Sequence, residues 1–361
     1  MWYRTKASEI LGIAYPVMQG PFGGNLSSVA LVAAVSNAGG LGGYGGYTLS
    51  EAELFEVDQK IKAATNKPYN INLWVSDTDA TEGSVPDDHF QVARQLFKPY
   101  FDALDIPVPQ KPGTFKSRFE NQVEVILRQK PAVFSFVFGI PHQDILERCH
   151  RLGIVTVGAA TTLAEALALE SAGVDMIVAS GFEAGGHRPS FLAPAESSTV
   201  GTFVLVQLIR EKVKVPVIAA GGIANGKGVA AALALGADAV QIGTAFLACE
   251  ESNATDIHRQ MLFSDAATTT MLSRAFTGRL GRGITTRMAE QLAGKEQHFL
   301  PFPLQTQFMS PLRVAAIEQQ KRDLILFWSG QIAPVLKYKK AGALLNAIVQ
   351  ETSAYFEQLK A

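Results

Sequence analysis

Short apolar runs alternate with segments of helical periodicity over the first 250 residues of the chain. The segments at 27–39, 162–173 and 225–237 repeat apolar residues with a helical period, which is typical of helices that bury one face. The apolar runs between such segments are short enough to be buried strands. The pattern predicts strands at Tyr15–Met18, Leu41–Tyr44, Tyr69–Trp74, Ala132–Phe138, Val155–Gly158, Met176–Ser180, Val217–Ala220 and Ala239–Ile242.

This succession of strand–helix units indicates an α/β protein, and we expect a (β/α)8 TIM barrel. Gly39, Gly173 and Gly236 end predicted helices, where glycine tolerates the left-handed conformation. A doubly wound parallel sheet is the alternative, but eight strands with glycines after nearly every one favour the barrel. In such barrels the active site lies at the carboxyl ends of the strands.

Two parts of the chain depart from this alternation. An insertion at about 76–114 follows the third strand, and its acidic opening, SDTDATEGSVPDD, is expected to be a solvated loop. After Cys249 the strand pattern stops. We therefore expect a barrel domain at 1–250, an additional mostly helical lid or substrate domain at 251–330, and a C-terminal helix in 331–361 that packs back on the barrel.

Composition narrows the class of protein. The chain is 47% hydrophobic and 18% charged, which is typical of a globular protein. Its formal charge of -1, from 32 basic and 33 acidic residues, gives no field that favours nucleic acid or an anionic membrane, so we expect neither as a partner. Cys149 and Cys249 fit buried thiols of a reducing compartment, and we find no signal peptide or transmembrane pattern. A cytoplasmic protein is expected.

Glycines after the last two predicted strands are candidates for binding phosphate. Gly222 follows the seventh strand, and the pair Gly243 and Thr244 follows the eighth. In TIM barrels the loops at these two places commonly bind phosphate through backbone N–H groups, although both could also be simple tight turns. A formal GxGxxG match at 40–45 follows a helix instead of opening one, so it does not indicate a dinucleotide site.

Polar groups at the ends of other strands would complete a nucleotide-sized site. Backbone groups of Met18, Gln19 and Gly20 end the first strand, and Asn72 lies in the third. Together with a phosphate site they would suit FMN, which has one phosphate and a flat ring. His187 follows the sixth strand behind two glycines, at the mouth of the predicted barrel. It is either a structural histidine or a catalytic group beside the ring.

Several motifs together resemble the nitronate monooxygenase (2-nitropropane dioxygenase) family. They are AVSNAGGLG, GFEAGGHRPS, VIAAGGI, AVQIGTAF, FTGRLGRGITTRM and FWSGQ, and they occur in family order between about residues 15 and 331. The resemblance implies non-covalently bound FMN and identifies His187 with the active-site histidine of the family. By motif, the residues that would bind FMN are Met18, Gln19, Gly20, Asn72, Ser180, Gly185, Gly186, Gly222, Gln241, Ile242, Gly243, Thr244, Thr277, Gly278 and Arg279.

The implied activity is oxidation of alkyl nitronates or nitroalkanes by O2 to a carbonyl compound and nitrite. The alternative is an NAD(P)H-dependent FMN reductase of an enoyl thioester or a quinone, since such enzymes share the barrel and the EAGGH segment. His187 would act as a base on a neutral nitroalkane, or would only orient the substrate. We expect small-molecule substrates, no metal, and a monomer or homodimer.

The chain departs from its relatives where the substrate would bind. Val137 replaces a histidine that is frequent in the fourth strand, and Phe302, Thr306 and Ser310 lie where other members carry tyrosines and a lysine. Loss of such groups removes the charge-assisted bonds that a carboxylate needs. An apolar ligand is therefore expected in the pocket that contains Val137 and Phe302.

Overall fold

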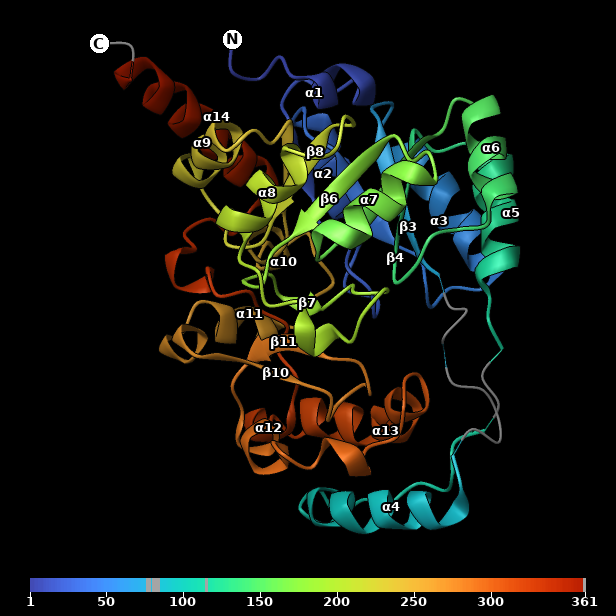
Figure 1. Ribbon diagram of the computed structural model, residues 1–361. Coiled ribbons are helices and arrows are strands. Elements are labelled where there is room, and N and C mark those ends of the chain that lie inside the picture. Colours follow the sequence, from blue (N-terminus) through green and yellow to red (C-terminus); the bar gives the residue numbers. More distant parts are fainter. Residues whose placement is uncertain (76–78, 80–84, 114–115, 360–361) are drawn as a thin grey trace.

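The protein folds as a closed parallel barrel in this computed structural model, which describes residues 1–75, 79, 85–113 and 116–359 (Figure 1). Eight strands form one sheet in the order β1-β9-β8-β6-β5-β4-β3-β2. Met18 pairs with Leu41, which joins the first strand to the second and closes the barrel, so the predicted TIM barrel is confirmed. The strands are β1 (Val17–Gln19), β2 (Gly42–Gly45), β3 (Tyr69–Trp74), β4 (Val133–Val137), β5 (Val155–Ala160), β6 (Met176–Ser180), β8 (Val217–Ala220) and β9 (Ala239–Ile242).

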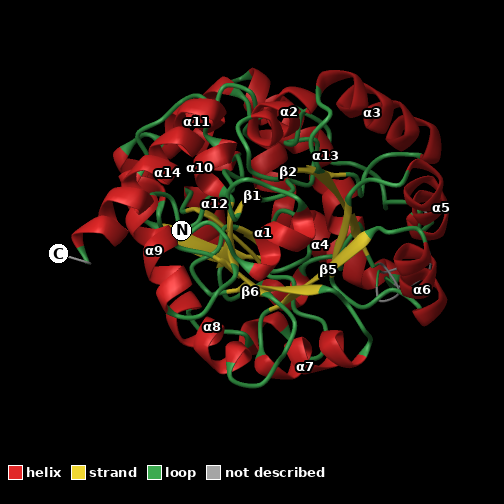
Figure 2. Ribbon diagram, turned by 90° about the horizontal axis from the view of Figure 1, so that it is seen from above, coloured by secondary structure: helices red, strands yellow, loops and turns green. Residues whose placement is uncertain are grey.

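Helices surround the barrel, as the view from above shows (Figure 2). Ser28, Ser50, Thr162 and Asn225 each precede such a helix and accept a hydrogen bond from an N–H of its first turn, so polar residues mark where these helices begin. The helices of the barrel part are α1 (Lys6–Leu11), α2 (Val29–Asn37), α3 (Glu51–Ala64), α5 (Phe119–Gln129), α6 (Gln143–Arg151), α7 (Leu163–Ser171), α8 (Thr202–Arg210), α9 (Gly226–Ala234) and α10 (Thr244–Leu247).

A second layer covers the end of the barrel at which the strands finish (Figure 1). It contains α11 (Asp256–Leu262), α12 (Arg287–Leu292) and α13 (Leu304–Glu318). It also contains a small antiparallel sheet, which the sequence did not predict, of β10 (Thr270–Ser273), β11 (Gly281–Ile284) and β7 (Gly186–His187). We call residues 251–330, the part of this layer other than β7, the lid. Because β7 belongs to the loop after β6, the sheet joins the barrel to the lid.

The helix of the insertion, α4 (Asp87–Asp102), packs on the lid and lies beyond α13 (Figure 1). Phe90, Phe97 and Phe101 surround Phe308 of α13, with ring centroids 5.9, 5.8 and 5.5 Å from that ring. The predicted acidic loop at the start of the insertion lies outside the described residues except for Asp79 and the residues from 85 onward.

The last helix, α14 (Ala341–Gln358), packs against α2 and α9 of the barrel. Leu344, Leu345 and Ile348 are buried in the same core as the strands. The Glu351 carboxylate accepts a hydrogen bond of 2.9 Å from the N–H of Gly226 at the start of α9. None of the helices in the described part of the chain is long and apolar enough to span a bilayer.

Candidate functional site

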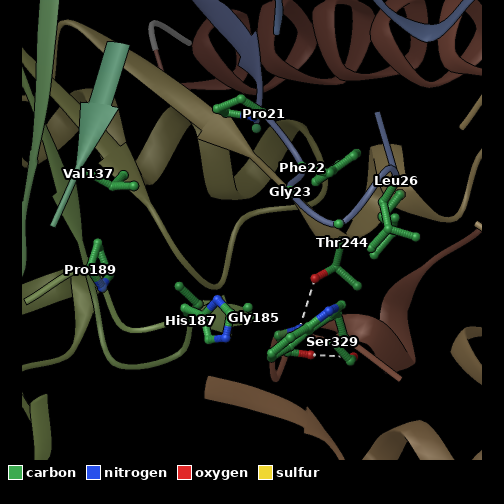
Figure 3. A pocket seen from close by; sticks show the side chains of 18 of the residues that line it. Pro21, Phe22, Gly23, Leu26, Val137, Gly185, His187, Pro189, Thr244 and Ser329 are labelled. Carbon is green, nitrogen blue, oxygen red and sulfur yellow. Dashed lines mark hydrogen bonds between the residues drawn. The ribbon is translucent and has the colours of Figure 1, made fainter. Parts of the chain in front are cut away.

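A cavity of about 360 Å³ lies between the carboxyl ends of the strands and the lid. Its volume is within the range of small-molecule sites in enzymes. Figure 3 shows Val137 and Pro189 on one side and Thr244 and Ser329 on another, with His187 facing the same space. The predicted site residues that line this cavity are Gly20, Asn72, Val137, Ser180, Gly185, Gly186, His187, Gly222, Gln241, Gly243, Thr244, Thr277 and Phe302.

Two glycines expose their backbone to the cavity at the place where the sequence predicted phosphate binding. Gly222 has a φ of +71°, which favours glycine, and a Cβ atom at Gly243 would meet nothing within 4 Å. Within the described part of the chain, neither N–H group has a hydrogen-bond acceptor. Backbone N–H groups withdrawn from water are normally paired. Two unpaired ones at one edge of a cavity therefore fit a ligand with strong acceptors, such as a phosphate.

The side chains of three other predicted residues do not face the cavity. Met18 is packed inside the barrel, and Ile242 is fully buried in the core around it. The Gln19 side chain accepts a hydrogen bond of 2.8 Å from the N–H of Gly43 and so joins β1 to β2. These positions could contact a ligand only through their backbones.

The glycines before His187 permit close packing of the lid on the barrel. A Cβ atom at Gly185 would lie 2.4 Å from the backbone nitrogen of Gly330, so only glycine fits there. The next residue, Gly186, has a φ of +82° and pairs with Arg282 of β11, which places His187 opposite Gly281. The His187 ring is consequently held between the barrel and the lid.

Thr277 is the hydrogen-bond partner of the His187 ring, whose Nε2 lies 2.8 Å from Oγ1 of Thr277. The Thr277 oxygen also accepts from the N–H of Arg279 at 3.3 Å, and its one hydrogen can go to the Arg279 carbonyl at 3.1 Å or to Nε2. We assign that hydrogen to the carbonyl, which leaves the proton of the imidazole on Nε2 and a lone pair on Nδ1.

The surroundings of His187 keep the imidazole neutral. Its pKa is lowered to about 3. Burial is the largest cause, and the positive charges of Arg279 and Arg274 contribute to the same shift. Four aromatic rings surround part of it. These are Trp74, Phe138, Phe302 and Trp328, with centroids 5.4, 6.3, 6.2 and 4.7 Å from the imidazole.

Arg279 and Gly278 lie behind this wall and do not line the cavity. The Arg279 guanidinium lies 3.8 Å from the centroid of Phe138 and 4.5 Å from that of Phe302, and it forms an ion pair with Asp79. A Cβ atom at Gly278 would lie 2.5 Å from the backbone nitrogen of Phe302. In the structure both residues thus support the wall, and their predicted contact with the cofactor stays a prediction.

Other lining residues were not identified from the sequence as parts of the site. His258 is buried, its Nε2 lies 2.9 Å from the carbonyl of Trp328, and burial lowers its pKa to about 4. Glu183 lines the cavity while its carboxylate accepts hydrogen bonds from Thr202. Arg313 of α13 also lines it. Helical periodicity alone does not distinguish a residue that faces such a cavity from one that faces bulk water.

Arg188, which follows His187, has a structural role. Its buried guanidinium donates to the carbonyls of Gly181 at 2.6 Å, Ser180 at 3.2 Å and Ser198 at 3.0 Å. These bonds fix the loop after β6 to the segment before α8. The partner of this arginine is therefore a neighbouring loop.

Comparison with known proteins agrees with this site. The family model for nitronate monooxygenase matches residues 4–351. The chain belongs to the nitronate monooxygenase family. It is 35% identical over 352 residues to a probable nitronate monooxygenase of Staphylococcus aureus (strain Newman), covering 97% of this chain and 98% of the relative. The enzyme is therefore a flavin-dependent oxidoreductase.

Two solved structures are similar over nearly their whole length. Nitroalkane oxidase from Streptomyces ansochromogenes matches with a TM-score of 0.89 and 31% identity, covering 96% of this chain and 98% of that one. FabK from Thermotoga maritima matches with a TM-score of 0.76 and 27% identity, covering 99% and 98%.

Replacing Thr277 by valine tests the tautomer of His187. The variant keeps the shape of the side chain but removes the acceptor of the Nε2 proton, at a cost of about 1–3 kcal/mol, and we expect kcat/KM to fall about 10- to 100-fold. The control Thr277→Ser keeps the hydroxyl and should retain activity. Nitrogen-15 NMR of the imidazole reports the tautomer directly. Unchanged activity and an unchanged Nε2–H tautomer in the valine variant would contradict the assignment.

The low pKa values of His187 and His258 predict how stability depends on pH. Between about pH 4 and 6.5 the unfolded chain binds a proton at each histidine and the native protein does not. The free energy of unfolding should therefore rise with pH, by about 1.4 kcal/mol per pH unit for each histidine. Urea unfolding near pH 5 should show a smaller slope in His187→Asn. An equal slope would mean that His187 is protonated in the native state.

Proposed function

We propose that this enzyme oxidises alkyl nitronates with O2 to a carbonyl compound and nitrite, with FMN as its cofactor. The observation that carries the proposal is the neutral imidazole of His187 beside a cavity that has unpaired glycine N–H groups at one edge and aromatic rings at another. The names of the relatives, nitronate monooxygenase and nitroalkane oxidase, point to the same chemistry.

The residues present fit FMN. Gly222 and Gly243 would hold its phosphate through their backbone N–H groups, and Gly185 and Gly186 would let the flat ring approach the backbone. Polar side chains between these points, among them Ser180 and Gln241, line the cavity and would bind the part of the cofactor between phosphate and ring. Bound FMN would accept electrons from the substrate and pass them to O2.

The electrostatics around His187 favour a nitronate over a neutral nitroalkane. A base works best when its pKa lies near the operating pH, and an imidazole with a pKa of about 3 is weak. Arg279 and Arg274, which disfavour the imidazolium, would also favour an anion at the same place, with part of their charge offset by Asp79 and Glu196. A nitronate is already an anion and needs no base. Val137, Phe138 and Phe302 would surround its alkyl chain.

The likeness to FabK supports a second candidate, the reduction of an enoyl thioester by NAD(P)H. The same barrel and a similar lid would serve either reaction, because fold alone does not determine chemistry. The arginines around His187 attract an anion, and an enoyl thioester carries no charge at its reacting carbons. We therefore place the nitronate reaction first.

Anaerobic absorbance titration of the purified protein separates the two functions. Ethyl and propyl nitronate are added first, and NADH and NADPH are added to separate samples. Bleaching of the flavin by nitronate alone supports the oxidase, and production of nitrite on admission of air completes the test. Bleaching only by a nicotinamide would assign the reductase, and a protein that cannot be reconstituted with FMN would contradict both.

Replacing His187 by asparagine tests its role. We expect FMN to be retained, since the backbone glycines are unchanged, and the turnover of neutral nitroalkanes, which is slow with so weak a base, to fall further because asparagine cannot accept the α-proton. Nitronates should be affected less because they need no proton removal. Steady-state kinetics with nitroethane and ethyl nitronate give the comparison. Full activity on nitroethane would exclude His187 from the mechanism.

We also propose a cytoplasmic location and a monomer or homodimer. Cys149 and Cys249 are buried free thiols, as predicted, which suits a reducing compartment. Burial raises the pKa of Cys149 to about 11 and that of Cys249 to about 12, so both stay protonated and unreactive.

A further inference from the structure

The cavity continues from His187 into the lid, along one face of α13. This face starts beside the imidazole, because the Thr306 hydroxyl donates to the carbonyl of Thr277 at 3.3 Å and Thr277 is bonded to the His187 ring. The lining residues further along the helix are Met309, Ser310, Leu312 and Arg313. From residue 306 to residue 313 the helix rises about 10 Å. We call the part of the cavity beside this face the branch.

The chain after α13 forms a second wall of the branch. Leu324, Leu326 and Trp328 line the cavity, whereas the two residues between them are buried in the core of the lid. This alternation is typical of extended chain, which covers about 13 Å in four residues. The Trp328 ring lies 4.7 Å from the His187 imidazole, so this wall also starts beside the candidate catalytic residue.

Both walls lead away from the barrel. The N–H of Gly330 donates to the Thr244 hydroxyl of the barrel at 2.8 Å, which places the barrel end of the second wall near residue 330 and its far end at Leu324. At that far end α13 packs against the turn Arg322–Leu324. Leu312 and Leu324 belong to the same apolar cluster. The two walls therefore enclose one elongated branch that begins at His187 and ends inside the lid.

The interior of the branch is apolar, and its edge is polar. Met309, Leu312 and Leu324 are buried. The lining residues of α13 that are exposed at the surface are polar, and they are Thr306, Ser310 and Arg313. Water beside an apolar surface is replaced favourably by apolar atoms of a ligand. A chain of methylene groups with no polar atoms along its length fits such a branch.

We infer that the branch binds a linear alkyl chain of about eight carbon atoms, the length that matches a rise of about 10 Å along α13. The inference rests on the proposed function: the nitronate lies at His187, the first methylene groups contact Val137 and Phe302, and the others follow α13. Each methylene that leaves water should raise affinity about two- to fourfold. An ethyl or propyl chain ends before the branch, so the preferred nitronates are longer.

Calorimetric titration of the FMN-loaded protein with 1-butanol, 1-hexanol and 1-octanol tests the branch without turnover. These probes share the hydroxyl group and differ only in chain length. We expect 1-octanol to bind at least about tenfold more tightly than 1-butanol, with 1-hexanol between them. Equal affinity for all three, or no binding by any, would overturn the inference.

Two variants locate the chain. Leu326→Asn and Met309→Gln each keep the approximate size of a lining side chain and add a polar amide, and each should lower the ratio of octanol to butanol affinity about tenfold. The control is Val314→Thr, at a residue of α13 that is 52% exposed and does not line the cavity, and it should keep the ratio. Retained flavin absorbance verifies that each variant is folded. An unchanged ratio in both lining variants would overturn the placement.

Anaerobic reduction of the flavin shows which compound carries the chain. We expect octyl nitronate to reach half-saturation at a concentration about tenfold lower than ethyl nitronate does. Equal half-saturation would overturn the inference. If the alcohols bind as expected but no nitronate reduces the flavin, the proposed function alone is contradicted.

Discussion

The pairing of β7 with β11 is the constraint on which the site depends. Two residues of a barrel loop, Gly186 and His187, pair in antiparallel register with Arg282 and Gly281 of the lid. A Cβ atom at Gly281 would lie 2.6 Å from the Trp328 ring and 3.1 Å from the His187 ring, so the absence of a side chain lets both rings pack there. The candidate catalytic residue is thus positioned by lid and barrel together, and neither would suffice alone.

This arrangement also explains the chemistry that the cavity can support. Packing of the lid removes water from His187, and the same layer supplies Arg274 and Arg279. Dehydration and positive charge both favour the neutral ring, and the positive charge also favours an anion beside it. The side of the cavity formed by β8 and β9 is different, because it exposes backbone N–H groups at Gly222 and Gly243. One cavity therefore offers a place for a phosphate and a place for an anionic substrate.

The sequence predicted the barrel well where buried branched and apolar residues dominate. The bounds of β3, β6, β8 and β9 agree with the prediction. The second strand begins one residue later than predicted, at Gly42, whose backbone packs against Val32; a Cβ atom there would lie 2.2 Å from the Val32 oxygen. Glycine carries no strand signal, so tertiary packing determines that boundary.

The lid and the part of the cavity lined by α13 were harder to predict from the sequence. The two residues of β7 and the GRGI segment of β11 show no alternation, and their pairing joins segments about a hundred residues apart. His187 was found because glycines and a strand end mark it. Arg313 was not identified as a lining residue, because its neighbours follow the same helical pattern as those of a solvent-facing arginine. Only the three-dimensional structure shows which face of α13 meets the cavity.

A crystal structure of the purified protein with its flavin would test the central claim most directly. We predict FMN in the cavity under the lid, with its phosphate on the backbone N–H groups of Gly222 and Gly243 and its ring against Gly185, Gly186 and His187. A flavin bound elsewhere, or a ring separated from His187 by the lid, would contradict it.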